Sequence, residues 1–149
     1  MRGILVCYDG SLAGRGTIAA ATELLLSRSV VVLNVAPLET VGEAYVPVGD
    51  DRPAAHDGLA ADALDYAAEG AELARAAGVD ARAHADLDAP TWAGVLEVAD
   101  EIDAPVIILE SRAWAGVRAL LEGNAAQELT KRAERPVLVI PGPTGTRGA

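Results

Sequence analysis

The chain has 149 residues, with 12 Lys+Arg against 22 Asp+Glu and a formal net charge of -10. That length suits one domain, which can bury roughly two-thirds of its unfolded surface. The negative charge argues against nucleic acid and anionic membranes as partners, because both require clustered basic residues. One cysteine and two histidines exclude a disulfide framework and argue against a metal centre. The sequence contains no signal peptide or membrane-spanning run, so we expect a cytoplasmic protein.

Short apolar runs alternate with helical patterns along the chain. The apolar runs predict strands over 3–8, 30–36, 81–85, 106–109 and 137–140, the third being the weakest. Apolar residues at helical spacing predict helices over 17–26, 59–77, 91–102 and 124–133, the last with Asn124 as its N-cap. Continuous apolarity indicates strands covered on both faces, as in a parallel sheet. We therefore predict a single doubly wound α/β domain with a five-stranded parallel sheet and about four helices.

The remaining segments carry weaker signals. Glycines, prolines and paired aspartates over 37–57 predict a mobile loop, and we expect a flexible tail over 142–149 after a domain spanning 1–141. Cys7, within the first strand, is expected to be a buried small apolar side chain. Trp92 continues the apolar stripe of the third helix and is expected in the core.

The first candidate site is Asp9-Gly10-Ser11, which directly follows the first strand. Gly10 permits a tight turn and Ser11 can cap the next helix. Open α/β sheets bind ligands at the carboxyl ends of their strands, where the strand order reverses. The triplet also fits a plain strand-to-helix turn. Ser11 has no base beside it in the sequence, which gives nucleophilic catalysis no support.

The second candidate site is the long connection over 110–124, which leads into the last helix. It contains Gly116, Gly123, Arg112 and Arg118. Backbone N–H groups at a helix N-terminus can hold an anion, and arginines strengthen such a site. A solvated loop, with its arginines paired to local acids, is the alternative interpretation.

Four stretches together resemble the universal stress protein family. Residues 4–11 (ILVCYDGS) are similar to its first strand and turn, and 32–37 (VLNVAP) to its second strand. Residues 90–111 resemble its third helix and fourth strand, and the ending 135–141 (RPVLVIP) is typical of the family. The resemblance covers nearly the whole chain.

This resemblance implies the strand order 3-2-1-4-5, with the two candidate sites meeting between strands one and four. Many family members bind ATP or AMP there, whereas another branch does not bind nucleotide. Members usually form homodimers, often through the last strand. The apolar strand over 137–140 fits such an edge.

The family's phosphate motif has two glycines separated by two residues, then nine residues, then a third glycine and Ser/Thr. On this chain these positions fall on Glu110, Ala113, Gly123 and Asn124, so the spacing is kept but only Gly123 matches. Glu110 brings a negative charge, and a carboxylate ~4 Å from a phosphate charge costs about 1 kcal/mol in water. Asn124 can still donate a hydrogen bond.

The adenosine half of the site is better matched. The resemblance places Asp9 near the nucleoside and the backbone of Val35 against the adenine. We predict AMP or ATP, with magnesium, as ligand and no structural metal. The predicted nucleotide-binding residues are Asp9, Val35, Leu109, Ala113, Gly116, Gly123, Asn124 and Ala125.

Three functions remain open at this point. The first is an adenine-nucleotide-binding regulatory module in stress physiology. The second is a homodimeric interaction module that has lost nucleotide binding, which Glu110 and Ala113 favour. The third is an enzyme, a slow ATPase or nucleotidyl transferase, although no general base, metal cluster or complete phosphate loop is visible in the sequence. We therefore expect a protein that is not an enzyme.

Overall fold

Nine helices and strands make up the described part of the computed structural model, which covers residues 3–25, 29–37, 52–88, 91–110 and 125–140. In chain order they are β1 (Ile4–Cys7), α1 (Leu12–Leu25), β2 (Ser29–Pro37), α3 (Arg52–Ala76), β3 (Asp80–Asp88), α4 (Thr91–Glu101), β4 (Ile107–Glu110), α6 (Ala125–Arg132) and β5 (Val137–Ile140). The five strands form one parallel sheet in the order β3-β2-β1-β4-β5. The predicted α/β fold and strand order are thus confirmed.

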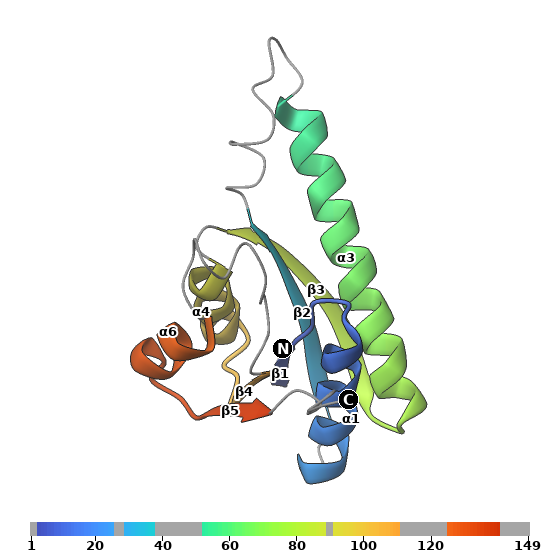
Figure 1. Ribbon diagram of the computed structural model, residues 1–149, viewed down its shortest axis with the longest axis vertical. Coiled ribbons are helices and arrows are strands. Elements are labelled where there is room, and N and C mark those ends of the chain that lie inside the picture. Colours follow the sequence, from blue (N-terminus) through green and yellow to red (C-terminus); the bar gives the residue numbers. More distant parts are fainter. Residues whose placement is uncertain (1–2, 26–28, 38–51, 89–90, 111–124, 141–149) are drawn as a thin grey trace, which may run out of the picture.

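The sheet is covered on both faces, as the continuous apolar runs predict. Helices α1 and α3 lie on one face, and α4 and α6 lie on the other (Figure 1). Successive strand side chains point to opposite faces, so each strand supplies both layers of the core. On β1, for example, Leu5 and Cys7 pack on the α4/α6 side, whereas Val6 and the following residue Tyr8 pack on the α1/α3 side. Cys7 is 2% exposed, which confirms its predicted burial.

Helix α3 approaches the sheet closely at Gly70. A Cβ at this position would lie 2.7 Å from a side-chain carbon of Val32 and 2.8 Å from the ring of Tyr8. Buried Ala67, Ala71 and Ala74 flank Gly70 on the same helix. This strip of small residues brings α3 down onto Tyr8, the last buried residue before the first candidate site.

On the opposite face, two arginines join α4 to α6 and to the segment that follows α6. Arg135 donates hydrogen bonds from Nη1 to the carbonyl oxygens of Ala99 (2.8 Å) and Ala104 (2.7 Å), and it also pairs with Asp100. These contacts satisfy carbonyl groups at the end of α4. The Arg132 guanidinium lies 4.3 Å from the ring centroid of Trp92, which is half-buried against the core beneath α4.

Several element boundaries differ from the sequence predictions. Helix α1 begins at Leu12 rather than at 17, because its first turn is held by a cap and not by apolar residues. The prediction of a loop through residue 57 is wrong from Arg52 onward, where α3 begins. Pro53 lies in the first turn of α3, where the missing N–H of proline leaves no bond unmade.

Two strands also differ from prediction. Strand β3 runs over Asp80–Asp88 rather than 81–85 and pairs with β2 along its whole length. Strand β4 ends at Glu110, so this residue belongs to the sheet. The rest of the predicted loop and the predicted tail over 142–149 lie outside the described residues. In the part of the chain that the structure describes, none of the helices has the length and apolar character that crossing a membrane requires.

Candidate functional site

The strand order reverses at β1, which lies between β2 and β4 in the sheet. Strand β1 ends at Cys7, whereas its neighbour β2 continues in register with β3 as far as Pro37. The short central strand therefore leaves the end of β2 without a β1 neighbour. The chain turns away through Tyr8, Asp9, Gly10 and Ser11, which we call the β1–α1 turn.

Asp9 organises the β1–α1 turn through one carboxylate oxygen. Its Oδ1 accepts hydrogen bonds from the Ser11 backbone N–H (2.9 Å) and from the Ser11 hydroxyl (2.5 Å). The Ser11 Oγ in turn accepts from the Gly14 N–H (2.9 Å), which confirms Ser11 as the cap of α1. Asp9 is half-buried. Because these bonds use Oδ1, Oδ2 is the oxygen with which Asp9 can bind a ligand hydroxyl.

The structure corrects the expectation that Ser11 has no base beside it, because the Asp9 carboxylate accepts a hydrogen bond from the Ser11 hydroxyl. The same hydroxyl caps α1, however, so its geometry is that of a helix N-terminus.

Gly10 gives the turn its direction. Its φ of 82° lies in the left-handed region that favours glycine. The ring of Tyr66 from α3 covers it so closely that a Cβ on Gly10 would lie 2.5 Å from Tyr66 Cδ1. Tyr66 is itself 47% exposed. An aromatic ring therefore forms part of the surface directly beside Asp9.

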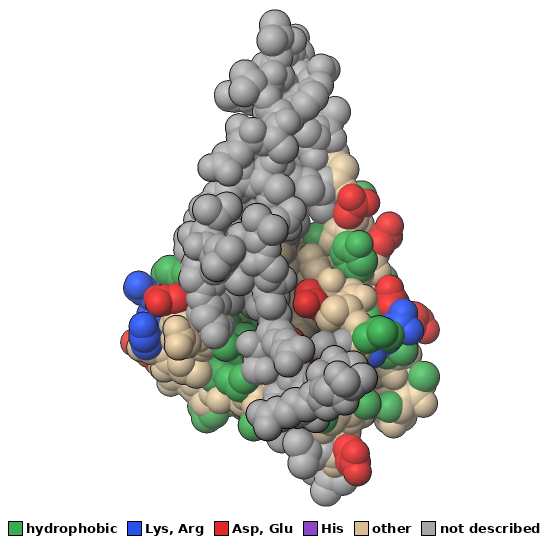
Figure 2. Space-filling model, in the orientation of Figure 1, with side chains coloured by type: hydrophobic (Ala, Val, Ile, Leu, Met, Phe, Trp, Pro, Cys, Tyr) green, Lys and Arg blue, Asp and Glu red, His purple; other side chains and the backbone are tan. Residues whose placement is uncertain are grey.

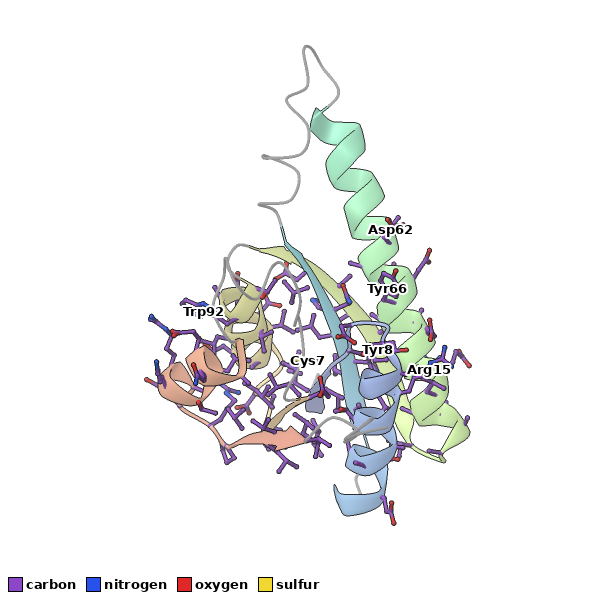
Figure 3. The ribbon with its side chains drawn as sticks, in the orientation of Figure 1. Cys7, Tyr8, Arg15, Asp62, Tyr66 and Trp92 are labelled. Atoms are coloured by element: carbon purple, nitrogen blue, oxygen red, sulfur yellow. The ribbon has the colours of Figure 1, made fainter. Side chains whose placement is uncertain are left out.

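Tyr8 is held at both its side chain and its backbone. Its hydroxyl donates to Glu69 Oε1 (2.8 Å), and Arg15 Nη2 donates to the same oxygen (2.6 Å). The Tyr8 carbonyl accepts from Asn34 Nδ2 on β2 (2.8 Å). Figure 3 shows Tyr8, Arg15 and Tyr66 on the α1/α3 side of the sheet, where these contacts join β1 to both helices.

The charges of this network are linked. Burial, reinforced by the hydrogen bond to Glu69, raises the pKa of Tyr8 to about 12. The hydrogen bond from Tyr8, together with the Arg15 guanidinium, lowers the pKa of the Glu69 carboxyl. At neutral pH the network therefore contains a neutral phenol, a carboxylate and a guanidinium.

Two predicted site residues, Val35 and Leu109, have buried side chains. Val35 is 1% exposed and Leu109 is 0% exposed, and both pack in the core on the α4/α6 side. A ligand can therefore reach only their backbone groups. This fits the predicted role of Val35, which the family resemblance assigns to its backbone.

Glu110 is the last residue of β4 and is 2% exposed. The alternation of β4, with Ile108 packed on the α1/α3 side, places the Glu110 side chain on that same side, level with Tyr8. Glu110 takes part in at least one polar or electrostatic interaction within the chain. The sequence analysis treats Glu110 as part of a loop, whereas the structure makes it a buried strand residue.

The predicted phosphate half of the site is described only at its far end. Ala113, Gly116, Gly123 and Asn124 lie outside the described residues. Ala125 is the first residue of α6. Helix α6 follows β4 in the chain, so its N-terminus, like the N-terminus of α1, lies toward the carboxyl edge of the sheet (Figure 1).

The structure thus brings Asp9, the Val35 backbone and Glu110 to one edge of the sheet. It adds Asn34, Glu69 and Tyr66, which the sequence analysis missed. Asn34 has a visible signal, since it is the one polar residue within an apolar run. Glu69 and Tyr66 have none, because they meet the turn only through the packing of α3. The described residues contain no cluster of side chains that could hold a metal ion.

Comparison with known proteins gives a family and a fold. The model of the universal stress protein family matches residues 1–141. A universal stress family protein from Burkholderia pseudomallei superposes with a TM-score of 0.70 at 22% identity, over 93% of this chain and 95% of that one. A search of curated proteins finds no match.

Two further similar structures contain nucleotides. The universal stress protein from Archaeoglobus fulgidus in complex with dAMP has a TM-score of 0.64 at 22% identity, over 94% of this chain and 98% of that one. A family protein from Arabidopsis thaliana with AMP bound has a TM-score of 0.60 at 14% identity, over 97% and 94%. At these identities the structural likeness shows the fold.

Proposed function

Because this chain belongs to the universal stress protein family, we propose that it binds an adenine nucleotide and acts as a regulatory module in stress physiology. Two similar structures contain dAMP and AMP. The observation that carries the proposal is the β1–α1 turn, where Asp9 accepts both Ser11 hydrogen bonds through Oδ1, and Oδ2 takes no part in them. The cytoplasmic location expected from the sequence stays a prediction.

The site favours a nucleoside monophosphate over ATP. The adenosine end has Asp9 and the backbone of Val35, whereas the phosphate end begins at buried Glu110 in place of a glycine. Each added phosphate brings more negative charge toward this carboxylate. We therefore propose AMP as the better ligand, with ATP and magnesium as the weaker alternative.

Calorimetric titration with AMP and with ATP, each with and without magnesium, tests this proposal. We expect saturable AMP binding. The variant Asp9→Asn keeps the Oδ1 that accepts from Ser11 but replaces Oδ2 with an N–H donor, so we expect AMP affinity to fall about tenfold or more. The matched control is Asp80→Asn, an exposed first residue of β3 at the opposite edge of the parallel sheet. Equal affinities in Asp9→Asn and Asp80→Asn would place the ligand elsewhere.

Glu110 is tested by its uncharged counterpart. We expect Glu110→Gln to raise ATP affinity about fivefold, since removing a charge ~4 Å from phosphate recovers about 1 kcal/mol or more. AMP affinity should rise less, because AMP carries fewer charges. Glu110→Gly, which restores the family's glycine, should strengthen ATP binding as well. Unchanged ATP affinity in both variants would show that this position does not face phosphate.

A homodimeric interaction module is the second candidate, and the buried Glu110 in the phosphate motif favours it. The absence of binding to either nucleotide would select it. We also propose that the chain is not an enzyme. ATP turnover that disappears in Asp9→Ala would instead establish the slow ATPase.

A further inference from the structure

Asn34 stands alone as a polar residue in the apolar run of β2, and its side chain is buried at 7% exposure. A buried amide on a central strand requires hydrogen-bond partners. Asn34 Nδ2 finds one in the carbonyl oxygen of Tyr8, 2.8 Å away on the neighbouring chain segment. The amide thus bridges β2 and the β1–α1 turn.

This bridge lies where the pairing of β1 with β2 stops. Their register runs from Ile4↔Val30 to Cys7↔Leu33, and the Tyr8 N–H then donates to the Leu33 carbonyl (2.9 Å). If the parallel ladder continued, the Tyr8 carbonyl would next accept from the Val35 N–H. The side chain of Asn34 takes this acceptor instead.

The peptide groups of Val35 are left without a pairing partner on β1. In a strand, the N–H and C=O of alternate residues point to the same side, so those of Val35 point to the same side as those of Leu33, toward β1. The β1 chain has already turned away at Asp9 and Gly10. Pairing with β3, through Val35↔Asp86 and on to Pro37↔Asp88, keeps this part of β2 extended.

Resting on the proposed nucleotide function, we infer that Asn34 is a positioning residue that keeps the Val35 peptide groups open and thereby makes the site selective for adenine. Adenine presents an acceptor at N1 beside a donor at N6, which complements an N–H and a C=O on one strand edge. Hypoxanthine presents the reverse, a donor at N1 and an acceptor at O6. The base of inosine monophosphate is therefore mismatched at this edge.

The test compares AMP with inosine monophosphate in the full chain and in Asn34→Leu, which keeps the volume but cannot donate a hydrogen bond. Without the amide, the Tyr8 carbonyl becomes free to accept the Val35 N–H and extend the ladder. We expect the ratio of AMP affinity to inosine monophosphate affinity to fall at least tenfold in Asn34→Leu. In the absence of ligand, hydrogen exchange of the Val35 amide should slow at least tenfold.

Two further variants separate this role from a general loss of stability. Val79→Ala shortens a buried side chain just before β3, at the amino end of the parallel sheet, and leaves the Tyr8 carbonyl bridged, so base selectivity should match the original chain. Asn34→Ala removes the same donor with a smaller side chain, and it should reproduce the changes of Asn34→Leu if that variant folds poorly.

The outcomes distinguish this inference from the proposed function. The positioning role would be overturned if Asn34→Leu lost AMP and inosine monophosphate affinity equally. It would also be overturned if the hydrogen-exchange rate of the Val35 amide did not change. Binding of neither nucleotide by the original chain would overturn the proposed function and, with it, the selectivity for adenine. In that case slower Val35 exchange would still support, and unchanged exchange would still overturn, the role of Asn34 in opening the strand edge.

Discussion

A side chain at Gly10 in the β1–α1 turn would cost stability in two ways, through backbone strain and through a clash with the Tyr66 ring. Comparison with Gly16 and Gly78 separates these two costs. Gly10 combines a positive φ with the covering Tyr66 ring, Gly78 has a φ of 89° and open space, and Gly16 has neither constraint. We expect Gly10→Ala to lower the free energy of unfolding most, and Gly78→Ala to lower it by about 1 kcal/mol. Gly16→Ala, within α1, should raise it by roughly 0.5–1 kcal/mol.

Urea unfolding of the three variants checks this order. Adding Tyr66→Ala to Gly10→Ala should bring the cost of the alanine down to that of Gly78→Ala, because only the backbone strain remains. Equal costs of Gly10→Ala and Gly78→Ala, each tested alone, would show that the Tyr66 ring moves aside freely. The difference in unfolding free energy between Gly10→Ala and Gly78→Ala therefore reports how firmly the Tyr66 ring of α3 is held over the turn beside Asp9.

At the residue scale, the sequence predicts the parts of the site that use local chemistry. Asp9 and Ser11 form a turn and a cap from residues two to three positions apart, so their roles are visible in the motif. The contact of Tyr8 with Glu69 spans 61 positions, and it depends on how α3 lies on the sheet. Sequence spacing alone carries no information about such a pair.

The network of Tyr8, Arg15 and Glu69 joins three elements, and it makes stability depend on alkaline pH. Burial raises the pKa of Tyr8 in the folded chain from its ordinary value of 10.0 to about 12. The stabilisation is therefore complete below pH 10 and is lost as the pH rises from 10 to 12. We expect Tyr8→Phe to cost about 1 kcal/mol at pH 8, for one lost hydrogen bond. At pH 11 this difference should have nearly disappeared.

Urea unfolding of both proteins between pH 8 and 11 measures this change. Burial also raises the pKa of the Cys7 thiol to about 12, so both proteins lose stability as the pH rises above 9. Only the difference between them reports on Tyr8. A difference that stays constant across the range would contradict the linkage between the phenol and the fold.

At the element scale, the predicted strands match best where both faces are buried. Strands β1, β2 and β4 come within about two residues of the apolar runs, because burial on two faces selects continuous apolar sequence. The outer strand β5 also matches, because its four half-buried residues are all apolar. Strand β3 is longer than predicted because it lies at the edge, where charged residues interrupt the run. Helix α3 extends through a proline that the sequence analysis treats as part of a loop. Apolar spacing therefore did not locate the beginning of this helix.

The surface of the whole molecule is uneven in charge. The net charge is -10, and acidic side chains are visible along the flank of α3 and at the lower edge (Figure 2). Exposed Asp62, Asp65 and Glu72 all belong to α3. A charge of this size favours solubility and opposes contact between acidic faces. Self-association is therefore expected through a surface with few charges.

The two edges of the sheet differ in this respect. The outer strand β3 alternates charged or polar side chains at Asp80, Arg82, His84 and Asp86, a pattern that discourages pairing with another strand. The other outer strand, β5, consists of four half-buried apolar residues. We propose that two copies of the chain join through β5 about a twofold axis, so that each covers the other's apolar edge.

Light scattering at micromolar concentration should give twice the mass of one chain. We expect Val139→Lys, on β5, to give the mass of a single chain, because it introduces a charge into the proposed contact. Ala83→Lys, a half-buried position on the β3 edge, should leave the dimer intact, and unfolding curves of both variants establish that they are folded. A single-chain mass for the original protein would contradict the dimer. A dimer that survives Val139→Lys but not Ala83→Lys would place the contact on the charged edge instead.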